Sequence, residues 1–314
     1  MSSDSQLQRE GIFYGLSAFL LWGVMPVYFK SVAHVPPLEV LGQRILWSFA
    51  FTAVLILVLK RGPQLRRLLR NRRQLCILTL TSCIIGFNWL LFIWSVANER
   101  MVEASLGYFI NPLVNMLFGF LFLRERMTRI QTIAIGLAVV GVGLDLVVFG
   151  SLPWVALALA ISFGLYGLLR KQLSVDSMTG MLVETAVLLV PALMYLAFVA
   201  DSPTSDWLGN AWSLNLLLML SGPATTIPLM LFAAAAVRLQ LTTLGFMQYI
   251  APSMMFLLAT QVYGETITQA KWMTFLLIWA ALVLFSLNAI LQEKRRRAVR
   301  EVAESGAVEQ SRSI

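Results

Sequence analysis

Charged residues and histidine are scarce in this chain of 314 residues. Only 13% of the residues are charged, whereas soluble domains carry about 25%. Because His34 is the single histidine, any histidine-dependent catalytic dyad would have to use it. The sequence contains no Walker phosphate loop, no His-Glu-x-x-His zinc motif and no Gly-x-Ser-x-Gly nucleophile motif. We therefore expect neither an enzyme nor a bound metal or cofactor.

Cysteine is equally scarce, and its spacing argues against a structural disulfide. Cys76 and Cys83 are the only two cysteines, and both fall on one predicted helix. Seven residues correspond to about 10 Å along a helix axis, which is too far for a disulfide bond. We interpret both thiols as apolar packing groups.

Long apolar runs dominate the sequence, of which 58% is hydrophobic. A run of about 18 apolar residues crosses ~30 Å of hydrocarbon, and a spanning segment must satisfy its own backbone hydrogen bonds, as a helix does. The sequence therefore predicts an all-α membrane protein with ten transmembrane helices. Their predicted ranges are 11–29, 38–59, 74–97, 101–123, 130–149, 152–169, 178–199, 213–236, 241–263 and 271–291.

The distribution of Lys and Arg predicts the orientation of these helices. With the N-terminus in the cytoplasm, 20 of the 24 basic residues lie on the cytoplasmic side. Lys30, Arg100 and Lys271 lie outside, and Arg44 lies within a span. This bias follows the positive-inside rule, so the net charge of +8 needs no nucleic-acid partner. We expect a multi-pass protein of the bacterial inner (plasma) membrane with both termini cytoplasmic, including a basic tail over 293–314.

The two halves of the chain repeat each other at an offset of 140 residues. Equivalent positions are Pro112 and Pro252, Glu125 and Glu265, and Arg44 and Glu184. Each half holds five predicted helices, and an odd number makes the second half enter the membrane from the opposite side. The sequence thus predicts two inverted five-helix repeats, over 1–150 and 151–292. Inverted repeats are typical of transporters that bind substrate near the bilayer midplane.

Four stretches resemble EamA domains of the drug/metabolite transporter superfamily. They are Asn88–Trp94, Glu103–Pro112, Thr243–Pro252 and Tyr263–Glu265, and the resemblance extends over about residues 10–292. It implies a ten-helix metabolite exporter whose cavity is lined by the first four helices of each repeat. The fifth helix of each repeat would be peripheral, and a homodimer through these helices is one option. The family is associated with chloramphenicol sensitivity, which does not fix a substrate.

Ionisable residues within spans are the strongest candidate functional residues, because each costs about 2.5–3.5 kcal/mol at the centre of a helix. Arg44 and Glu184 differ in depth by about 12 Å, so we do not expect them to pair with each other. We predict an outer pair, Arg44 with Glu103, and an inner pair, Glu184 with Arg238, which act as alternate gates. Two alternatives stay open: the four side chains snorkel to the interface, or they contact substrate.

Uncharged side chains provide a second set of candidates for the substrate pathway. These are Asn88, Trp89, Tyr108, Asn111, Gln248 and Tyr249. Amides within a membrane need hydrogen-bond partners, so they either bind substrate or bridge helices, and Trp89 either stacks on a ligand or packs. Pro112 and Pro252 are predicted to kink their helices. The kinks either turn carbonyls toward a cavity or only set helix curvature.

These features predict a secondary carrier of small organic metabolites that works by alternating access, with amino acids, related compounds and drugs as the leading class. The expected partners are the small-molecule substrate and the lipid bilayer. One alternative is a flippase for a lipid-linked metabolite, which would need a lateral opening between helices. A second is a non-transporting membrane sensor or scaffold.

Overall fold

The computed structural model describes residues 3–98, 100–150, 152–173, 175–262, 264, 269, 272–288 and 291, and these contain helices and turns but no strand. Nine described helices are long and apolar enough to span a membrane, and a tenth apolar helix, Trp272–Asn288, is shorter. The predicted all-α membrane protein is therefore confirmed, whereas the count of ten spanning helices stays a prediction.

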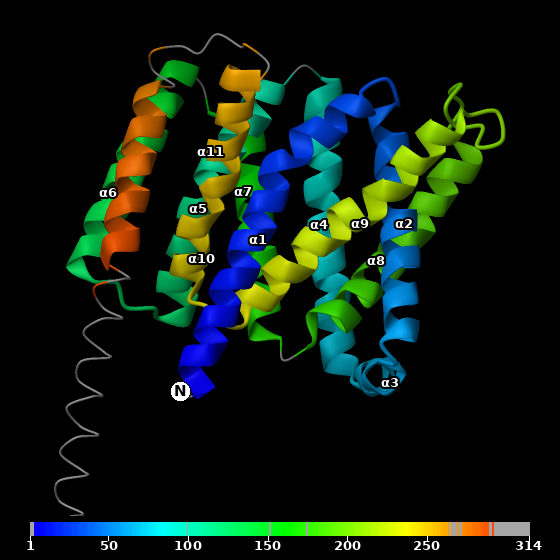
Figure 1. Ribbon diagram of the computed structural model, residues 1–314, viewed down its shortest axis with the longest axis horizontal. Coiled ribbons are helices and arrows are strands. Elements are labelled where there is room, and N and C mark those ends of the chain that lie inside the picture. The colour runs from blue at the N-terminus through cyan, green and yellow to red at the C-terminus, as the bar shows by residue number, and fades with distance from the viewer. Residues whose placement is uncertain are drawn as a thin grey trace, which may run out of the picture. The chain divides into compact units, whose positions relative to one another are not determined.

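The helices follow one another in chain order with short connections (Figure 1). They are α1 (Ser3–Ser31), α2 (Pro37–Val58), α3 (Gly62–Arg70), α4 (Arg72–Ala97), α5 (Met101–Leu123), α6 (Arg129–Phe149), α7 (Trp154–Gln172), α8 (Ser177–Phe198), α9 (Trp212–Ala236), α10 (Leu241–Gln248), α11 (Ile250–Leu257) and the π-helix η1 (Leu258–Val262).

The chain forms two compact units. Unit 1 combines Met1–Glu125 with Phe149–Ile267, and unit 2 combines Arg126–Val148 with Thr268–Ile314. In unit 2, α6 packs against the helix Trp272–Asn288. The Thr274 hydroxyl donates to the carbonyl of Gly141 at 3.1 Å, and the Asn288 amide donates to the Thr128 hydroxyl at 3.1 Å.

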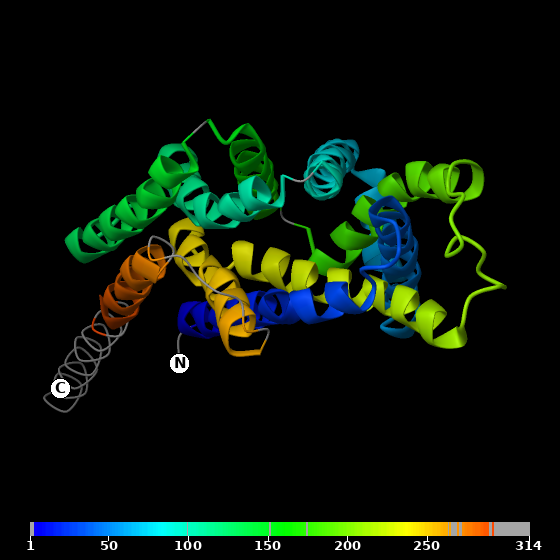
Figure 2. The ribbon, with the colours of Figure 1, turned by 90° about the horizontal axis from the view of Figure 1, so that it is seen from above.

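Unit 1 holds the candidate site, and its helices pack mainly across the two halves of the sequence. Helix α1 packs against α9 and α11, α2 against α8 and α9, α4 against α7 and α8, and α5 against α7 and α10. Viewed from above, α1 and α9 run alongside each other (Figure 2). Small residues permit close approach: a Cβ on Gly245 would lie 2.8 Å from the Pro112 carbonyl oxygen.

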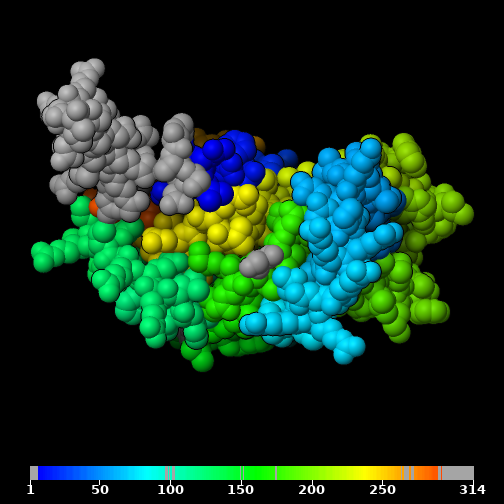
Figure 3. Space-filling view, turned by 90° about the horizontal axis from the view of Figure 1, so that it is seen from below, coloured from blue at the N-terminus to red at the C-terminus, as the bar shows by residue number. Residues whose placement is uncertain are grey.

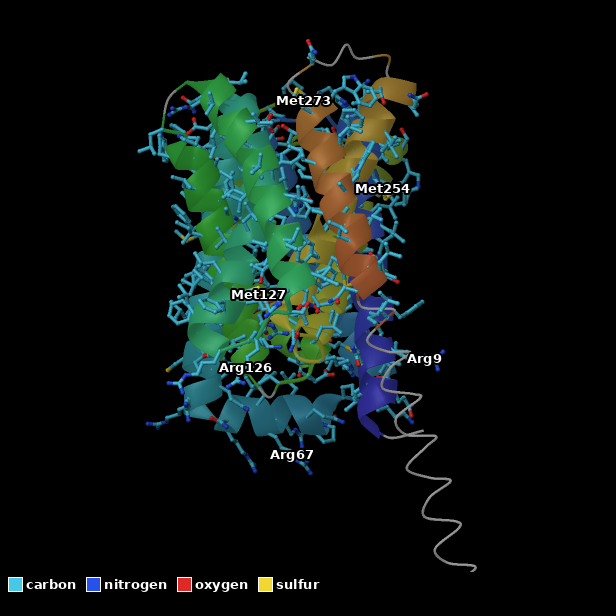
Figure 4. All side chains as sticks on the ribbon, turned by 90° about the vertical axis from the view of Figure 1, so that its left-hand side faces the viewer. Arg9, Arg67, Arg126, Met127, Met254 and Met273 are labelled. Atoms are coloured by element: carbon cyan, nitrogen blue, oxygen red, sulfur yellow. The ribbon has the colours of Figure 1, made fainter. Side chains whose placement is uncertain are left out.

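Helix α3 was not predicted, because residues 60–73 read as a charged connection. It has nine residues, too few to span a membrane. Leu68 is buried with Leu78 in a small apolar cluster, while arginines line its polar side, as in an interfacial amphipathic helix. The helix lies across one end of unit 1, the end where Arg9 and Arg67 are found (Figure 4).

Pro112 and Pro252, which align at the offset of 140 residues, differ in whether the helix is interrupted near them. Helix α5 continues through Pro112, whereas the helix that begins at Leu241 is interrupted at Tyr249, three residues before Pro252. Pro252 has no N–H to donate to the carbonyl of Gln248 one turn earlier, which accounts for an interruption at this place. The second segment then ends in the π-helix Leu258–Val262.

The tight contact between α2 and α9 yields a test of the packing. A Cβ on Gly222 would collide with the backbone of Trp47, whereas a Cβ on Gly136 in α6 would meet nothing within 4 Å. We expect Gly222→Ala to lower the free energy of unfolding by about 1–3 kcal/mol through overpacking. The matched Gly136→Ala should leave it unchanged or raise it by up to about 1 kcal/mol, because alanine favours a helix over glycine. Thermal unfolding of the purified proteins measures the stability of each variant. Equal stability of Gly222→Ala and Gly136→Ala would contradict the observed packing.

Candidate functional site

Arg44 lies within unit 1, held by side chains from three other helices. Its Nε donates to the Thr225 hydroxyl of α9 at 2.9 Å. The guanidinium carbon lies 5.3 Å from the centre of the Phe29 ring in α1 and 5.2 Å from that of Trp89 in α4. Both distances fall within the ~6 Å range of a cation–π contact. The planar guanidinium is suited to such packing and is fixed in one orientation by it.

The two terminal nitrogens of Arg44 remain available. Neither forms a hydrogen bond with a described residue, and neither is among the enclosed polar atoms that lack a partner. No carboxylate in the described part of the chain forms an ion pair with Arg44. The paired N–H groups of an arginine match the two oxygens of a carboxylate or phosphate. The structure thus holds an accessible cation within a membrane-spanning helix.

Two tyrosines are close enough to interact electrostatically with Arg44, namely Tyr28 and Tyr108. The Tyr28 hydroxyl donates to the carbonyl of Leu217 at 3.1 Å. Tyr108 is 40% exposed, packs edge-on against Phe92, and forms no hydrogen bond with a described residue. Asn111 follows Tyr108 by one turn of α5, and its buried Oδ1 lacks a hydrogen-bond partner. Tyr108 and Asn111 thus provide polar groups on successive turns of α5.

The predicted outer pair of Arg44 with Glu103 is not formed in this structure. Glu103 instead pairs with Arg100 at 3.0 Å and accepts a hydrogen bond from the backbone N–H of Val155 at 2.8 Å. Val155 lies in the first turn of α7, where unpaired N–H groups and the helix dipole favour a carboxylate. Glu103 therefore ties the start of α5 to the start of α7.

The predicted inner pair of Glu184 with Arg238 is also replaced by other partners. Buried Glu184 lies 3.8 Å from buried Arg170 of α7 and accepts hydrogen bonds from the hydroxyls of Thr81, at 2.6 Å, and Tyr166, at 3.3 Å. Arg238 instead pairs with Glu10 at 3.4 Å. The sequence signal for the observed pair is that Arg170 and Glu184 lie on consecutive helices joined by a short turn.

Two further charges hold the turn between α9 and α10 at this same end of unit 1. The Lys171 ammonium donates to the carbonyls of Ala236, at 3.1 Å, and Leu239. Glu125 accepts from the backbone N–H groups of Leu241, at 2.6 Å, and Thr242, at 2.9 Å. Atoms of α10, of the α7–α8 region and of α3 form a continuous row on this face (Figure 3). Charged contacts and packing therefore close the end of unit 1 that carries α3.

The uncharged candidates divide into two groups. Asn88 donates to the Leu159 carbonyl at 2.9 Å and to Ser162 at 2.8 Å, and so bridges α4 and α7. Gln248 accepts from Asn115 at 2.6 Å, and the Tyr249 hydroxyl donates to a backbone carbonyl of α5 at 3.3 Å. Those three bridge helices here. Trp89 and Tyr108 adjoin Arg44, and Asn111 retains an unpaired acceptor.

Sequence comparison agrees with a membrane transporter fold. Residues 9–146 match the EamA-like transporter family. The chain is 50% identical to an uncharacterized transporter of Vibrio cholerae, covering 92% of this chain and 96% of that one. It is 51% identical to Protein RarD of Salmonella typhimurium, covering 93% and 100% respectively.

A solved structure supports the fold independently. A protein crystal structure with 19% sequence identity matches with a TM-score of 0.71, covering 89% of this chain and 98% of that chain. At this identity the match concerns the fold alone. The helices suited to a membrane, the family match and the identity over nearly the full length lead to one conclusion: the chain belongs to the EamA-like transporter family, within the drug/metabolite transporter superfamily, and RarD proteins are among its relatives.

Proposed function

We propose that this protein is a secondary carrier that exports small organic metabolites across the bacterial inner membrane by alternating access. The observation that carries this proposal is Arg44, a guanidinium inside a spanning helix that has no carboxylate partner among the described residues. A charge in a span costs about 2.5–3.5 kcal/mol on insertion scales. Thr225, Phe29 and Trp89 offset part of this cost, and a ligand that neutralises the charge during transport would offset more of it.

Helix contacts support two inverted repeats, 1–150 and 151–292, as the basis of alternating access. If α1, α2, α4 and α5 correspond to α7, α8, α9 and α10–α11, each contact in one half should have a counterpart. The contact of α1 with α9 corresponds to that of α7 with α4, and α2 with α9 corresponds to α8 with α4. The contact of α5 with α7 corresponds to that of α11 with α1. Matching helix contacts in the two halves are expected for a transporter built from two copies of one unit.

The Glu184 cluster, defined by Glu184, Arg170, Thr81 and Tyr166, is our candidate for the inner closure. It joins α4, α7 and α8 near the end of unit 1 that carries α3. The arginines of α3 support the proposal that this end faces the cytoplasm, following the positive-inside rule. Export then requires the cluster to separate when substrate enters from the cytoplasm, and to close again before release outside.

A lateral cavity favours the flippase as a second candidate. It has a volume of about 390 Å³ and lies beside α2 and α8. Its lining residues are Gln43, Leu46, Trp47, Leu193, Leu196, Ala197 and Trp207. The Gln43 side chain already accepts a hydrogen bond from the Trp47 indole, so the cavity offers mainly apolar contact. Such a surface suits a lipid chain better than a polar metabolite.

Counterflow into proteoliposomes tests the carrier directly. The labelled panel contains amino acids, purines and chloramphenicol. We expect saturable flux of at least one solute, and we expect Arg44→Ala to reduce it at least about tenfold, because a hydrogen-bonded charge contributes ~1.5–3 kcal/mol. Arg66→Ala, which removes an exposed charge of α3, should change flux less than about twofold. Absence of flux across the whole panel, from folded protein, would favour the flippase.

Labelling of a buried cysteine tests the inner closure. Ile85 lies one turn deeper in α4 than Thr81 and is 1% exposed. In a background with Cys76→Ser and Cys83→Ser, Ile85→Cys should react slowly with an impermeant thiol reagent applied from the cytoplasmic side. Adding Arg170→Gln with Glu184→Gln should raise the labelling rate at least about tenfold, because the helices lose a buried ion pair.

The double substitution also provides a stability control. Either single substitution leaves one buried charge without its partner, so each should destabilise the protein by about 3–5 kcal/mol, and the double variant by less. An unchanged labelling rate in a double variant that remains folded would contradict the proposed closure.

A further inference from the structure

We propose that the Arg44 site binds an organic monocarboxylate, with the carboxylate on the two terminal nitrogens of Arg44 and a flat apolar body against the neighbouring aromatic rings. This inference rests on the proposed function in that it names the class of solute carried. Its three supports are the contacts of Arg44, the orientation of the guanidinium and the rings that surround it.

The contacts of Arg44 favour a negative ligand. The buried carboxylates of unit 1 have other partners: Glu39 accepts a hydrogen bond from Thr204, Glu103 pairs with Arg100, Glu125 caps α10, and Glu184 pairs with Arg170. None of them forms an ion pair with Arg44 among the described residues. A cationic solute would be repelled, and a neutral solute would leave the cation without an anionic partner. An anion would neutralise Arg44 locally.

The number of negative charges on the ligand is also restricted. Among described residues Arg44 is the only cation that contacts Phe29, Trp89 and Thr225. A phosphate monoester carries about 1.5 to 2 negative charges at neutral pH, more than one guanidinium neutralises. A carboxylate carries one and accepts two parallel N–H donors in bidentate geometry. The local chemistry thus matches a monocarboxylate.

The guanidinium is positioned before any ligand arrives. Thr225 holds Nε, and the rings of Phe29 and Trp89 fix the plane. The free edge is therefore the one formed by the terminal nitrogens. Preorganisation lowers the entropy cost of binding, and lysine at this position would lose both the planar contact with the rings and the paired donors.

Aromatic side chains lie near the guanidinium. Trp89 is partly buried and its ring centre lies 5.2 Å from the guanidinium carbon, and Tyr108 is 40% exposed and forms no hydrogen bond with a described residue. Aromatic rings prefer offset or edge-to-face contact with other flat groups. We infer that the body of the ligand contacts Trp89 and Tyr108 while its carboxylate engages Arg44. Neutral compounds such as chloramphenicol lack the charge that the site is built to hold.

Ligand-induced stabilisation of the purified full-length chain tests the proposal without relying on transport. The probes are benzoate, phenylacetate and indole-3-acetate, each compared with its primary amide, which has a similar shape and no charge. We expect the carboxylates to raise the midpoint of thermal unfolding, and the amides to leave it unchanged. Arg44→Gln should weaken carboxylate binding at least about tenfold, and Arg66→Gln should not.

A milder variant keeps the test decisive if Arg44→Gln fails to fold. Thr225→Val retains the cation and its rings and removes only the partner of Nε, so we expect carboxylate binding to weaken by about twofold to tenfold. The proposal is overturned if acids and amides stabilise the protein equally, if Arg44→Gln or Thr225→Val binds the acids like the parent protein, or if no acid stabilises it.

Flux measurements separate this proposal from the carrier itself. Carboxylate binding that depends on Arg44, without counterflow of the same acid, would support the anion site and contradict the carrier. Counterflow of a neutral or cationic solute that survives Arg44→Gln would support the carrier and overturn the anion site.

Discussion

Charge compensation inside the membrane is the constraint on which the arrangement of unit 1 depends. Charged groups in spans are costly, and most of those described here are compensated across helices. Glu103 joins α5 to α7, Glu125 joins α5 to α10, and Glu184 joins α8 to α4 and α7. The same contacts that neutralise these carboxylates therefore hold the bundle together. Among the described residues, Arg44 lies in a spanning helix without a carboxylate partner, and its terminal nitrogens form no hydrogen bond.

The ends of several long helices could be predicted from the sequence, because hydropathy is a local property. The predicted helix 178–199 lies within one residue of Ser177–Phe198 at each end, and 213–236 within one residue of Trp212–Ala236. Helix α3 was missed because nine amphipathic residues produce no long apolar run. Its arginines were nevertheless assigned to a membrane surface, which agrees with its place at one end of unit 1.

Charge partners could not be predicted in the same way. The place of a residue along its span gives only its expected depth. Pairing also depends on the rotation of each helix about its axis and on which helices are neighbours. Glu103 and Arg238 were assigned to Arg44 and Glu184 by depth, yet nearer partners, Arg100 and Glu10, engage them. The same limit explains why the partners of the uncharged polar candidates could not be predicted. Asn88 and Tyr249 bridge helices, while Tyr108 forms no hydrogen bond with a described residue.

The central claim, that solute binds at the free edge of Arg44, is tested most directly by a crystal structure with 4-bromobenzoate, whose bromine is located by anomalous scattering. The account predicts the carboxylate oxygens about 3 Å from the terminal nitrogens of Arg44, with the bromine beside Trp89 and Tyr108. An ordered ligand in the cavity lined by Trp47 and Trp207 instead, with Arg44 unoccupied, would contradict it.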